Sequence, residues 1–234
     1  MLKYSQFAIA VVAALVLATG ASVATAQNIT EGFDDITTLP AAGWAEQNNS
    51  VPLGVQPYFQ GNSAVFASQG GAANSYLGVN FNSGSGLSTI SNWKIMPNRV
   101  LSNGDTLKFY TRTVDTPAYP DRLQVRMSLN GASTNVGSTA TSVGDFTTLL
   151  LDINPTYTLS RYPNGWTQYS ITLSGIGAPT SGRLAFRYFV ENGGPSGANS
   201  DYIGIDTLEY TQAPEPAALA LLGIGGLALI RRRR

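Results

Sequence analysis

The 234-residue chain contains no cysteine and no histidine. The absence of cysteine excludes disulfide bonds and thiolate chemistry, so a domain made from this chain must be held together by the packing of its core. The absence of histidine removes the commonest general base and the usual zinc ligand, and it excludes serine–histidine–aspartate catalysis within the chain. Charged residues are also scarce, at 12% of the sequence.

The first 26 residues have the layout of a secretory signal peptide. A positive charge at Lys3 precedes an apolar stretch from Phe7 to Ala18, and the small residues Ala24 and Ala26 form an A-x-A cleavage site. An uncleaved anchor is the alternative, but this apolar stretch is shorter than the roughly 20 residues that span a bilayer core. We therefore expect signal peptidase to cleave after Ala26, so that the protein is exported.

A second apolar stretch, from Ala217 to Ile230, stands near the end of the chain and contains no charge. As a helix it would be about 21 Å long at ~1.5 Å per residue, whereas a bilayer core is about 30 Å thick. The stretch is therefore predicted to be a short transmembrane helix that holds the protein only briefly. A cluster of arginines follows it and predicts a cytoplasmic C-terminus, which leaves the rest of the chain outside the inner membrane. The cluster consists of Arg231, Arg232, Arg233 and Arg234.

The triplet Pro214, Glu215 and Pro216 stands directly before this stretch. Its two prolines keep the backbone extended, which suits a protease cleft. The triplet, the short span and the arginine cluster, in this order, resemble the PEP-CTERM sorting signal of Gram-negative bacteria. The resemblance implies that an exosortase-type membrane protease cuts near the triplet and that the protein, first anchored with its domain in the periplasm, reaches the cell surface or the extracellular space. A permanent C-terminal anchor with a proline hinge is the alternative.

Between the two ends, residues 27–213 have a length that fits one β domain with a sizeable core. This segment retains nine of the chain's basic side chains and thirteen of its acidic ones, a net charge of −4. A negative domain gives no reason to expect nucleic acid or an anionic membrane as a partner.

Segments rich in β-branched and aromatic residues alternate in this domain with turns made of Gly, Asn, Ser, Asp and Pro. In one of them, residues 122–129, apolar and polar side chains alternate, which predicts a strand with one buried face. Asn130 and Gly131 then predict a tight turn. The strands predicted in this way are residues 105–114, 122–129, 166–173, 183–190 and 202–210. Many such strands predict an all-β fold, a jelly-roll-like β-sandwich.

Several blocks of the domain resemble the choice-of-anchor J domain, in the expected order. They are EGFDDITTLPAAGW, ISNWKIMPNRVLSNGDTLKFYTRT, YPDRLQVRMSLNG, NGWTQYSITLSG and RLAFRYFVENGGPSGANSDYIGIDTLEY. The resemblance implies a jelly-roll sandwich on or outside the cell surface, related to cleaved adhesin and MAM-like modules. Lys94 departs from the family, which usually has an apolar residue there, and this puts only local burial in doubt.

Motifs for catalysis are weak. Residues 91–94 match the S-x-x-K pattern of serine β-lactamases, but they enter a strand-like segment and lack the partner motifs. Residues 84–86 lack the strand-to-helix context of a phosphate loop. Glycoside hydrolysis needs two carboxylates a few ångströms apart, and no E-x-E or E-x-D stands in a predicted strand. We therefore expect no catalytic residues and a role in binding or adhesion, with a secreted carbohydrate-active enzyme as the alternative.

Asp206, on the last predicted strand, shares a face with Tyr202, Gly204, Leu208 and Tyr210 in a regular strand. If that face is buried, the carboxylate needs a cation or hydrogen-bond donors. Modules similar to the choice-of-anchor J domain often hold a structural calcium ion where the first and last strands meet. The ligands predicted here are Glu31, Asp34, Asp35 and Asp206. An arginine partner such as Arg187, or exposure at a bulge, is the alternative.

The three tryptophans, Trp44, Trp93 and Trp166, could form a platform for sugar rings, although tryptophans in strands more often fill the core. Tyr58, Phe59 and Tyr119 are better candidates, because they are predicted to lie in loops. An exopolysaccharide or another surface glycan is the partner that such a platform predicts, but the sequence does not identify a ligand.

Overall fold

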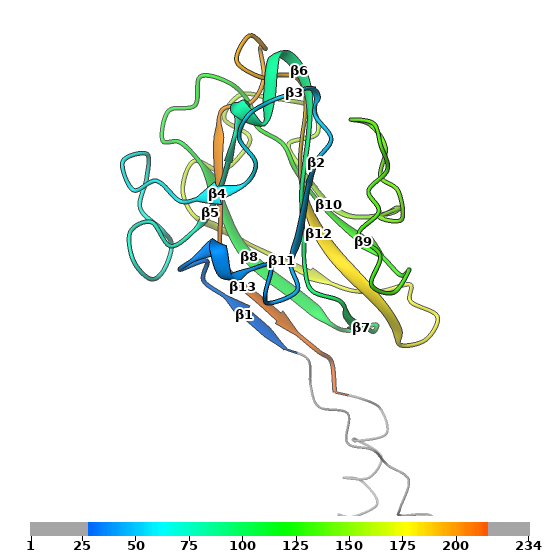
Figure 1. The fold of residues 1–234 in the computed structure, drawn as a ribbon. Coiled ribbons are helices and arrows are strands. Elements are labelled where there is room, and N and C mark those ends of the chain that lie inside the picture. Colours follow the sequence, from blue (N-terminus) through cyan, green and yellow to red (C-terminus); the bar gives the residue numbers. More distant parts are fainter. Residues whose placement is uncertain (1–27, 215–234) are drawn as a thin grey trace, which may run out of the picture. The chain divides into compact units, whose positions relative to one another are not determined.

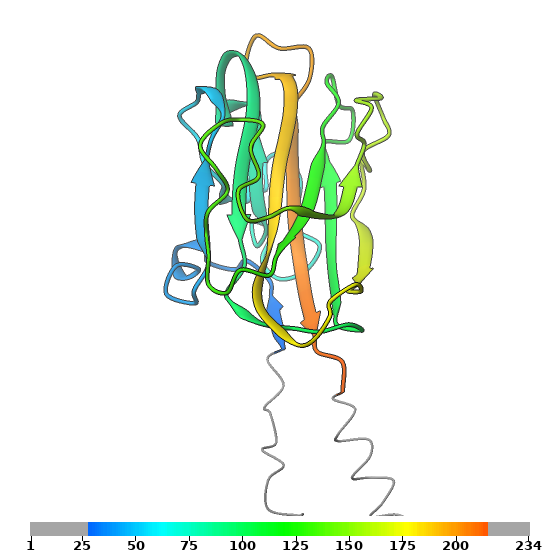
Figure 2. The same cartoon turned by 90° about the vertical axis from the view of Figure 1, so that its right-hand side faces the viewer.

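The computed structural model describes residues 28–214, and its regular structure is almost entirely β (Figure 1). Two sheets of antiparallel strands pack face to face, which confirms the predicted sandwich (Figure 2). No helix among the described residues is long and apolar enough to cross a membrane. The predicted signal peptide and the predicted helix at 217–230 lie outside the described residues.

The first sheet has the order β11, β8, β13, β5, β4, with β1 also paired to β13. Its strands are β1 (Ile29–Glu31), β4 (Phe59–Gln60), β5 (Leu77–Asn80), β8 (Thr106–Thr113), β11 (Thr167–Thr172) and β13 (Tyr202–Thr211). The second sheet has the order β10, β9, β12, β6, β2, with β3 paired to β6 and β7 paired to β12. Its strands are β2 (Ala45–Asn48), β3 (Val51–Leu53), β6 (Gly84–Ile95), β7 (Arg99–Leu101), β9 (Leu123–Ser128), β10 (Thr148–Ile153) and β12 (Thr180–Gly193). Two short 3-10 helices, η1 (Ile36–Thr38) and η2 (Phe81–Ser83), lie in the connections.

The main core lies between the sheets. On β8, Leu107 and Phe109 point inward while Lys108 and Tyr110 do not, as the period of two requires. The ring of Phe109 meets that of Phe186 on β12 edge to face, with centroids 4.9 Å apart. Contacts of this kind join the two sheets, and burial of their apolar surface is what stabilises a domain without disulfides.

β9 does not have the single buried face that its alternation predicts. Leu123, Val125 and Met127 lie in the main core as expected, but Gln124 on the opposite face is buried too. The reason is the segment 129–147, which folds back over the outer face of the second sheet. There its side chains Val136 and Phe146 pack against Trp93 of β6 in a second cluster of buried residues.

The predicted tight turn at Asn130 and Gly131 is present, because Ser133 N donates to the carbonyl of Asn130 at 3.1 Å, but the turn does not close a hairpin. Gly131 has a positive φ of 56°, as a turn residue needs, but the next strand, β10, begins only at Thr148. Leu129, predicted to lie on the buried face, is 39% exposed.

β13 is interrupted by a β-bulge. Its register with β8 shifts between Asp206 and Glu209, and Thr207 inside the bulge has a positive φ of 47°. The shift moves Leu208 and Tyr210 into the main core beside Ile203 and Ile205, whereas Tyr202 belongs to a separate aromatic cluster. The prediction that Asp206 shares a face with Leu208 and Tyr210 is wrong, because the extra residue reverses the alternation.

Lys94 is buried in β6, although the family resemblance had left the burial of this residue in doubt. Its ammonium group lies 2.9 Å from Glu46 on β2. The ion pair supplies the partner that a buried charge requires.

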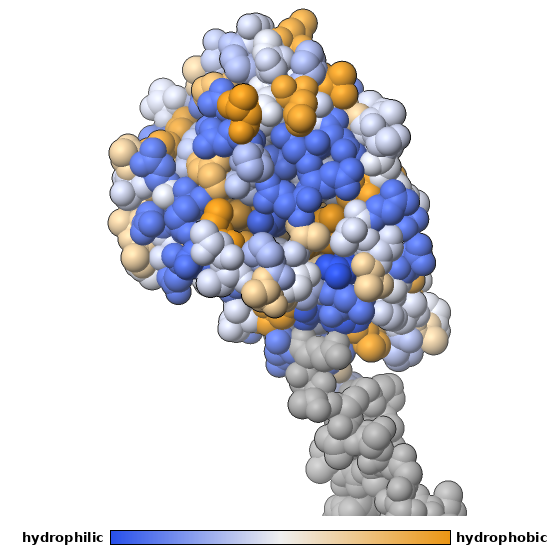
Figure 3. Space-filling view, in the orientation of Figure 1, coloured by the Kyte–Doolittle hydropathy of each residue, from blue (hydrophilic) through white to orange (hydrophobic). Residues whose placement is uncertain are grey.

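The surface seen in Figure 3 is largely hydrophilic, with orange apolar groups at the end where Figure 1 places β3 and β6. Leu53 and Leu87 are each 60% exposed there, and Val51 and Val55 are exposed beside them. This end is opposite to the one at which β1 begins and β13 ends (Figures 1 and 2).

Asp121 is fully buried inside the domain, as are Asp105 and Asp206. Its Oδ1 accepts hydrogen bonds from Tyr188 OH (2.5 Å) and Asp201 N (2.8 Å), and its Oδ2 lies 2.7 Å from Thr113 Oγ1. Thr113 Oγ1 also lies 2.9 Å from the carbonyl oxygen of Tyr202, which can only accept. Since the threonine hydroxyl has one proton, both contacts are satisfied when Asp121 is protonated. Burial raises the pKa of Asp121 to about 6.

This pKa predicts that the domain loses stability as pH rises from about 4 to above 6. The folded state holds the proton up to about pH 6, whereas the unfolded chain releases it near the ordinary value of 3.8, so the free energy of unfolding falls through this window. The fall should be on the order of 3 kcal/mol. The raised pKa of Asp206 acts in the same direction, while the lowered values of Asp35 and Asp145 act only below this range.

Denaturant unfolding of the parent and of Asp121→Asn at several pH values tests this prediction. The amide cannot ionise but can still donate to Thr113, so most of the pH dependence between 4 and 7 should disappear in the variant. Asp115→Asn, at an exposed position, is the matched control and should keep the parent's fall in unfolding free energy between pH 4 and 7. An equal fall in Asp121→Asn and the parent would assign the effect to other groups.

Candidate functional site

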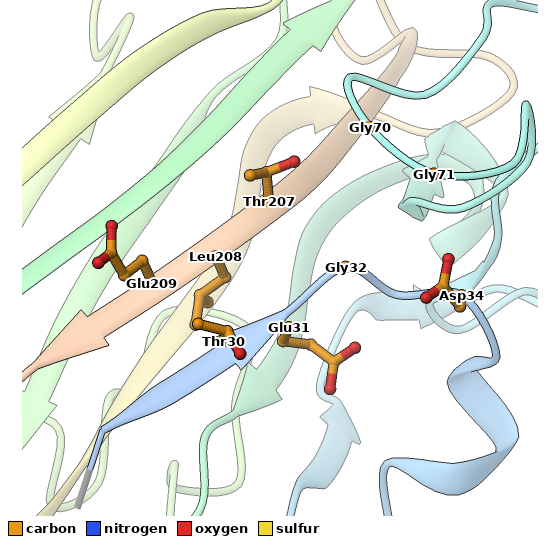
Figure 4. Close-up of a pocket in the computed structure, with 9 residues that line it drawn as sticks. All are labelled: Thr30, Glu31, Gly32, Asp34, Gly70, Gly71, Thr207, Leu208 and Glu209. Carbon is orange, nitrogen blue, oxygen red and sulfur yellow. The ribbon is translucent and has the colours of Figure 1, made fainter. Parts of the chain in front are cut away.

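A cleft of about 540 Å³ opens beside β1, between the bulge of β13 and the loop that joins β4 to β5 (Figure 4). It is the place where the first and last strands of the domain meet, with Glu31 opposite Leu208 in the ladder. The lining residues are Thr30, Glu31, Gly32, Asp34, Gly70, Gly71, Thr207, Leu208 and Glu209. Three carboxylates therefore line the cleft, and one of them, Glu209, also lies 3.6 Å from Lys108.

The turn after β1 places two of these carboxylates. Phe33 has a positive φ of 53° and its ring is fully buried against Trp44, so the chain turns sharply out of the strand at this residue. The amide of Phe33 donates to Glu31 Oε1 at 2.7 Å, which fixes that side chain. Asp34 follows on the exposed side of the turn. Figure 4 shows Glu31 and Asp34 on the same side of the cleft, with Glu209 on the other strand and away from both.

Asp206 does not face this cleft as a free ligand, because backbone amides satisfy its carboxylate. Oδ2 accepts from Gln69 N at 2.7 Å and from Gly70 N at 3.2 Å, and Oδ1 accepts from Thr207 N at 2.6 Å. Burial raises the pKa of Asp206, and these amide hydrogen bonds oppose the rise. The side chain therefore fastens the loop between β4 and β5 to the bulge of β13.

Arg187, the alternative partner considered for Asp206, does not contact it. Arg187 lies on β12 in the other sheet, where its Nε donates to Ser91 Oγ at 3.0 Å and its Nη2 donates to the carbonyl of Ala140. Its ring partners are Trp93 and Phe189. Arg187 therefore holds the segment 129–147 on the outer face of the second sheet.

The loop between β4 and β5 also covers the outer face of β13 with aromatic rings, together with Trp166. A Cβ atom on Gly204 would lie about 3 Å from Phe66, Trp166 and Tyr76, so only glycine allows the rings to approach this closely. Trp166 Nε1 donates to the carbonyl of Ala67 at 2.9 Å, which ties the loop to the start of β11. The guanidinium of Arg112 lies over the Phe66 ring at 4.5 Å.

The predicted aromatic platform is mostly buried. Trp44 and Trp93 belong to the core, which is the alternative that the sequence favoured for tryptophans in strands. Tyr58, a candidate for a sugar platform, is buried as well. Trp166 is partly buried, and Tyr119 is 45% exposed. These two are the aromatic candidates that keep access to solvent, together with the partly exposed Phe59.

The four predicted calcium ligands do not form one set. Asp35 turns away to cap η1, and hydrogen bonds from Thr37 lower its pKa, while Asp206 is held by amides. Among residues 28–214, no three Asp or Glu side chains lie together in a way that could hold a metal ion. Glu31 and Asp34 both line the cleft, and calcium accepts backbone and water oxygens beside carboxylates. Calcium binding stays a prediction, narrowed to these two residues.

The backbone amides of Gln69 and Gly70 donate to the Asp206 carboxylate, and the sequence did not reveal this role. Backbone donors have no residue signature, and the only sign of them is the glycine pair Gly70 and Gly71 in the loop. Gly71 has a positive φ of 78°, and a Cβ atom there would lie 2.9 Å from Asp34 Oδ1. This close approach requires glycine.

The weak catalytic motifs lie in a strand. Ser91 and Lys94 belong to β6, and Ser91 Oγ accepts from Trp93 Nε1 and Arg187 Nε. Residues 84–86 begin the same strand. Both segments are therefore structural parts of the second sheet.

The predicted processing sites stand at the limits of the described residues. Pro214 is the last described residue and is exposed. Glu215, Pro216, the arginines 231–234 and the cleavage-site residues Ala24 and Ala26 lie outside the described part.

Comparison with known proteins identifies the C-terminal segment. Residues 212–234 match the PEP-CTERM protein-sorting motif, which indicates an exported protein sorted to the cell surface. No curated protein matches the chain. The choice-of-anchor J resemblance stays a prediction.

Among solved structures, the chain is similar to two cleaved adhesin domains of Lys-gingipain from Porphyromonas gingivalis W83. The K1 domain has a TM-score of 0.54 and 22% sequence identity, covering 81% of this chain and 99% of that one. The K3 domain has a TM-score of 0.54 and 18% identity, covering 81% of this chain and 100% of that one. These values show a common fold.

A calcium titration of the melting temperature separates the roles of Asp34 and Asp206. If the cleft binds calcium, the ion should raise the melting temperature by mass action, and Asp34→Asn should abolish the rise. That variant should melt as the parent in chelator, because the Asp34 carboxylate has no hydrogen-bond or ion-pair partner among the described residues. Asp206→Ala should lower the melting temperature even in chelator, because it releases the loop between β4 and β5. The expected loss of unfolding free energy is about 3 kcal/mol.

Asp35→Asn is the matched control for Asp34→Asn, since an asparagine can still cap η1 and should keep the calcium response. A melting temperature of the parent that calcium leaves unchanged would reject metal binding in the cleft.

Proposed function

We propose that this protein is an exported, non-enzymatic binding or adhesion module that an exosortase-type protease processes and delivers to the cell surface or the extracellular space. The observation that carries the proposal is the match of residues 212–234 to the PEP-CTERM protein-sorting motif. Signal peptidase would remove residues 1–26, and the segment 217–230 would hold the precursor in the inner membrane until the protease acts.

The binding role rests on the domain between these ends. The gingipain domains that share its fold are named cleaved adhesin domains, and we extend that role to this chain. The absence of histidine and cysteine leaves few groups for catalysis. A secreted carbohydrate-active enzyme is the second candidate, and it would be recognised by turnover of polysaccharide that one carboxylate substitution abolishes.

We place the binding surface at two neighbouring loops that carry aromatic side chains with access to solvent. Tyr119 lies in the loop after β8, and Trp166 lies at the start of β11. Arg112 joins the loops, because its Nη2 donates to the carbonyl of Asn164 at 2.6 Å and also bonds Asp115. Aromatic rings beside amide and carboxylate groups suit a glycan, whose rings stack while its hydroxyls form hydrogen bonds.

Replacement of the sorting triplet tests the processing half of the proposal. The triple variant Pro214→Ala, Glu215→Ala, Pro216→Ala keeps the apolar stretch and the arginine cluster, so it should still be exported, lose its signal peptide and fold. It should then accumulate as an uncut, membrane-bound form, measured by fractionation and immunoblotting in the native host. A variant that is cut and released as fast as the parent would show that the triplet is only a hinge.

Binding to extracted surface polysaccharide, measured by co-sedimentation, tests the other half. Tyr119→Ala should weaken binding about fivefold to tenfold, because an aromatic stacking contact contributes roughly 1 kcal/mol. Leu53→Ala removes an apolar side chain on β3 that is 60% exposed, more than the 45% of Tyr119, and it should bind as the parent. Equal binding by Tyr119→Ala and the parent would reject the glycan surface at these loops.

A further inference from the structure

The folded domain holds the chain up to the residue before the sorting triplet. β13 ends at Thr211, yet the next two residues remain hydrogen-bonded to the domain. Gln212 N donates to Asn28 Oδ1 at 2.9 Å, and its side chain donates to the carbonyl of Val100 at 3.0 Å. Ala213 N donates to Asp105 Oδ1 at 2.8 Å. Pro214 follows directly, without a linker.

Asp105 is built to hold Ala213. The residue is fully buried, and its Oδ2 accepts from Ser102 N at 2.8 Å and from the hydroxyl of Tyr210. Among the described residues, Ala213 N is the donor to its other oxygen, Oδ1. Release of Ala213 would leave that oxygen without this donor, and an unsatisfied buried carboxylate oxygen is costly.

The approach of Ala213 to the domain is also close. Gly104 has a positive φ of 90°, and a Cβ atom there would lie 3.1 Å from the Ala213 side chain. A glycine at this position therefore allows the last residues of the domain to lie against the turn that precedes β8.

These contacts conflict with proteolysis at the triplet. A protease binds its substrate as an extended segment whose backbone pairs with the walls of the cleft. If cutting occurs near the triplet, Gln212 and Ala213 would have to lie in that cleft. Their amides are occupied by Asn28 and Asp105, so the two residues cannot bind the domain and the protease at the same time.

We propose that Gln212 and Ala213 form a latch that limits cleavage at the sorting triplet, and that Asp105 is its positioning residue. This inference rests on the proposed function, because it concerns the same protease. The latch opens transiently, and the protease captures the open form. Loss of a hydrogen bond to a charged group shifts such an opening equilibrium by about tenfold.

The test uses the full chain in the native host and measures the rate of C-terminal cleavage by pulse-chase. A six-residue Gly-Ser spacer between Ala213 and Pro214 adds roughly 20 Å of reach while the latch stays closed. The spacer variant should be cut about tenfold faster than the parent. Asp105→Asn should also be cut several-fold faster, because its amide holds Ala213 less strongly. Glu191→Gln, at an exposed position on β12, should be cut at the parent's rate.

Combining the two changes distinguishes a latch from a general loss of stability. Once the spacer bypasses the latch, Asp105→Asn should add no further acceleration, whereas a variant that acts by unfolding the domain would speed cleavage equally in both chains. If Asp105→Asn fails to fold, the spacer variant alone decides.

Cleavage of the spacer variant at the parent's rate or slower would overturn the latch. That result is distinct from failure of the proposed function, which the triple-alanine variant reports: if the triple-alanine variant stays uncut while the spacer has no effect, sorting stands and the latch fails.

Discussion

β13 is the strand on which the rest of the domain depends. It lies inside the first sheet, paired with β8 on one side and with β5 and β1 on the other. Its bulge sends Asp206 to the loop between β4 and β5, and Gly204 provides the flat surface on which that loop packs. Its last residues lead directly to the sorting segment. The central strand β13 therefore continues directly into the sorting segment. Any cleavage at that segment would take place next to a strand that the core holds in place.

This arrangement explains why the two ends of the described domain, residues 28–214, lie close together. β1 pairs with the second half of β13, so both ends of the described domain lie at the same end of the sandwich (Figure 2). Removal of an N-terminal segment and cutting at the C-terminal triplet would leave the strands on either side in place. Because the domain has no disulfide, hydrogen bonds such as those of Asp105 and Asn28 are what keep its last residues from fraying.

The sequence was sufficient for the strands whose side chains alternate and whose ends carry turn residues, such as β8 and β11. It did not predict β10, whose residues 149–151 are three consecutive leucines without a period of two. It also missed the burial of the outer face of β9, because the segment that covers it has no regular pattern. No glycine marks the bulge at Thr207, so the sequence did not predict it. The extra residue in the bulge places Leu208 and Tyr210 on the opposite face of the strand from the one predicted.

The position of the candidate site could be predicted, but the partners of its side chains could not. The family resemblance implied a carboxylate site where the first and last strands of the domain meet, and Glu31 and Asp34 do line the cleft there. The role of Asp206 could not be predicted, because its partners are backbone amides from a loop more than 130 residues away in sequence. Burial of Trp44, Trp93 and Tyr58 was likewise decided by long-range packing.

The central claim is that the protein reaches the surface as a domain processed at both ends. The most direct measurement is the intact mass of the protein recovered separately from membrane, periplasm and medium. The account predicts that the surface or released form begins at Gln27 and ends at or near the triplet 214–216, without the arginine cluster. Surface material whose mass still includes Arg234 would contradict it.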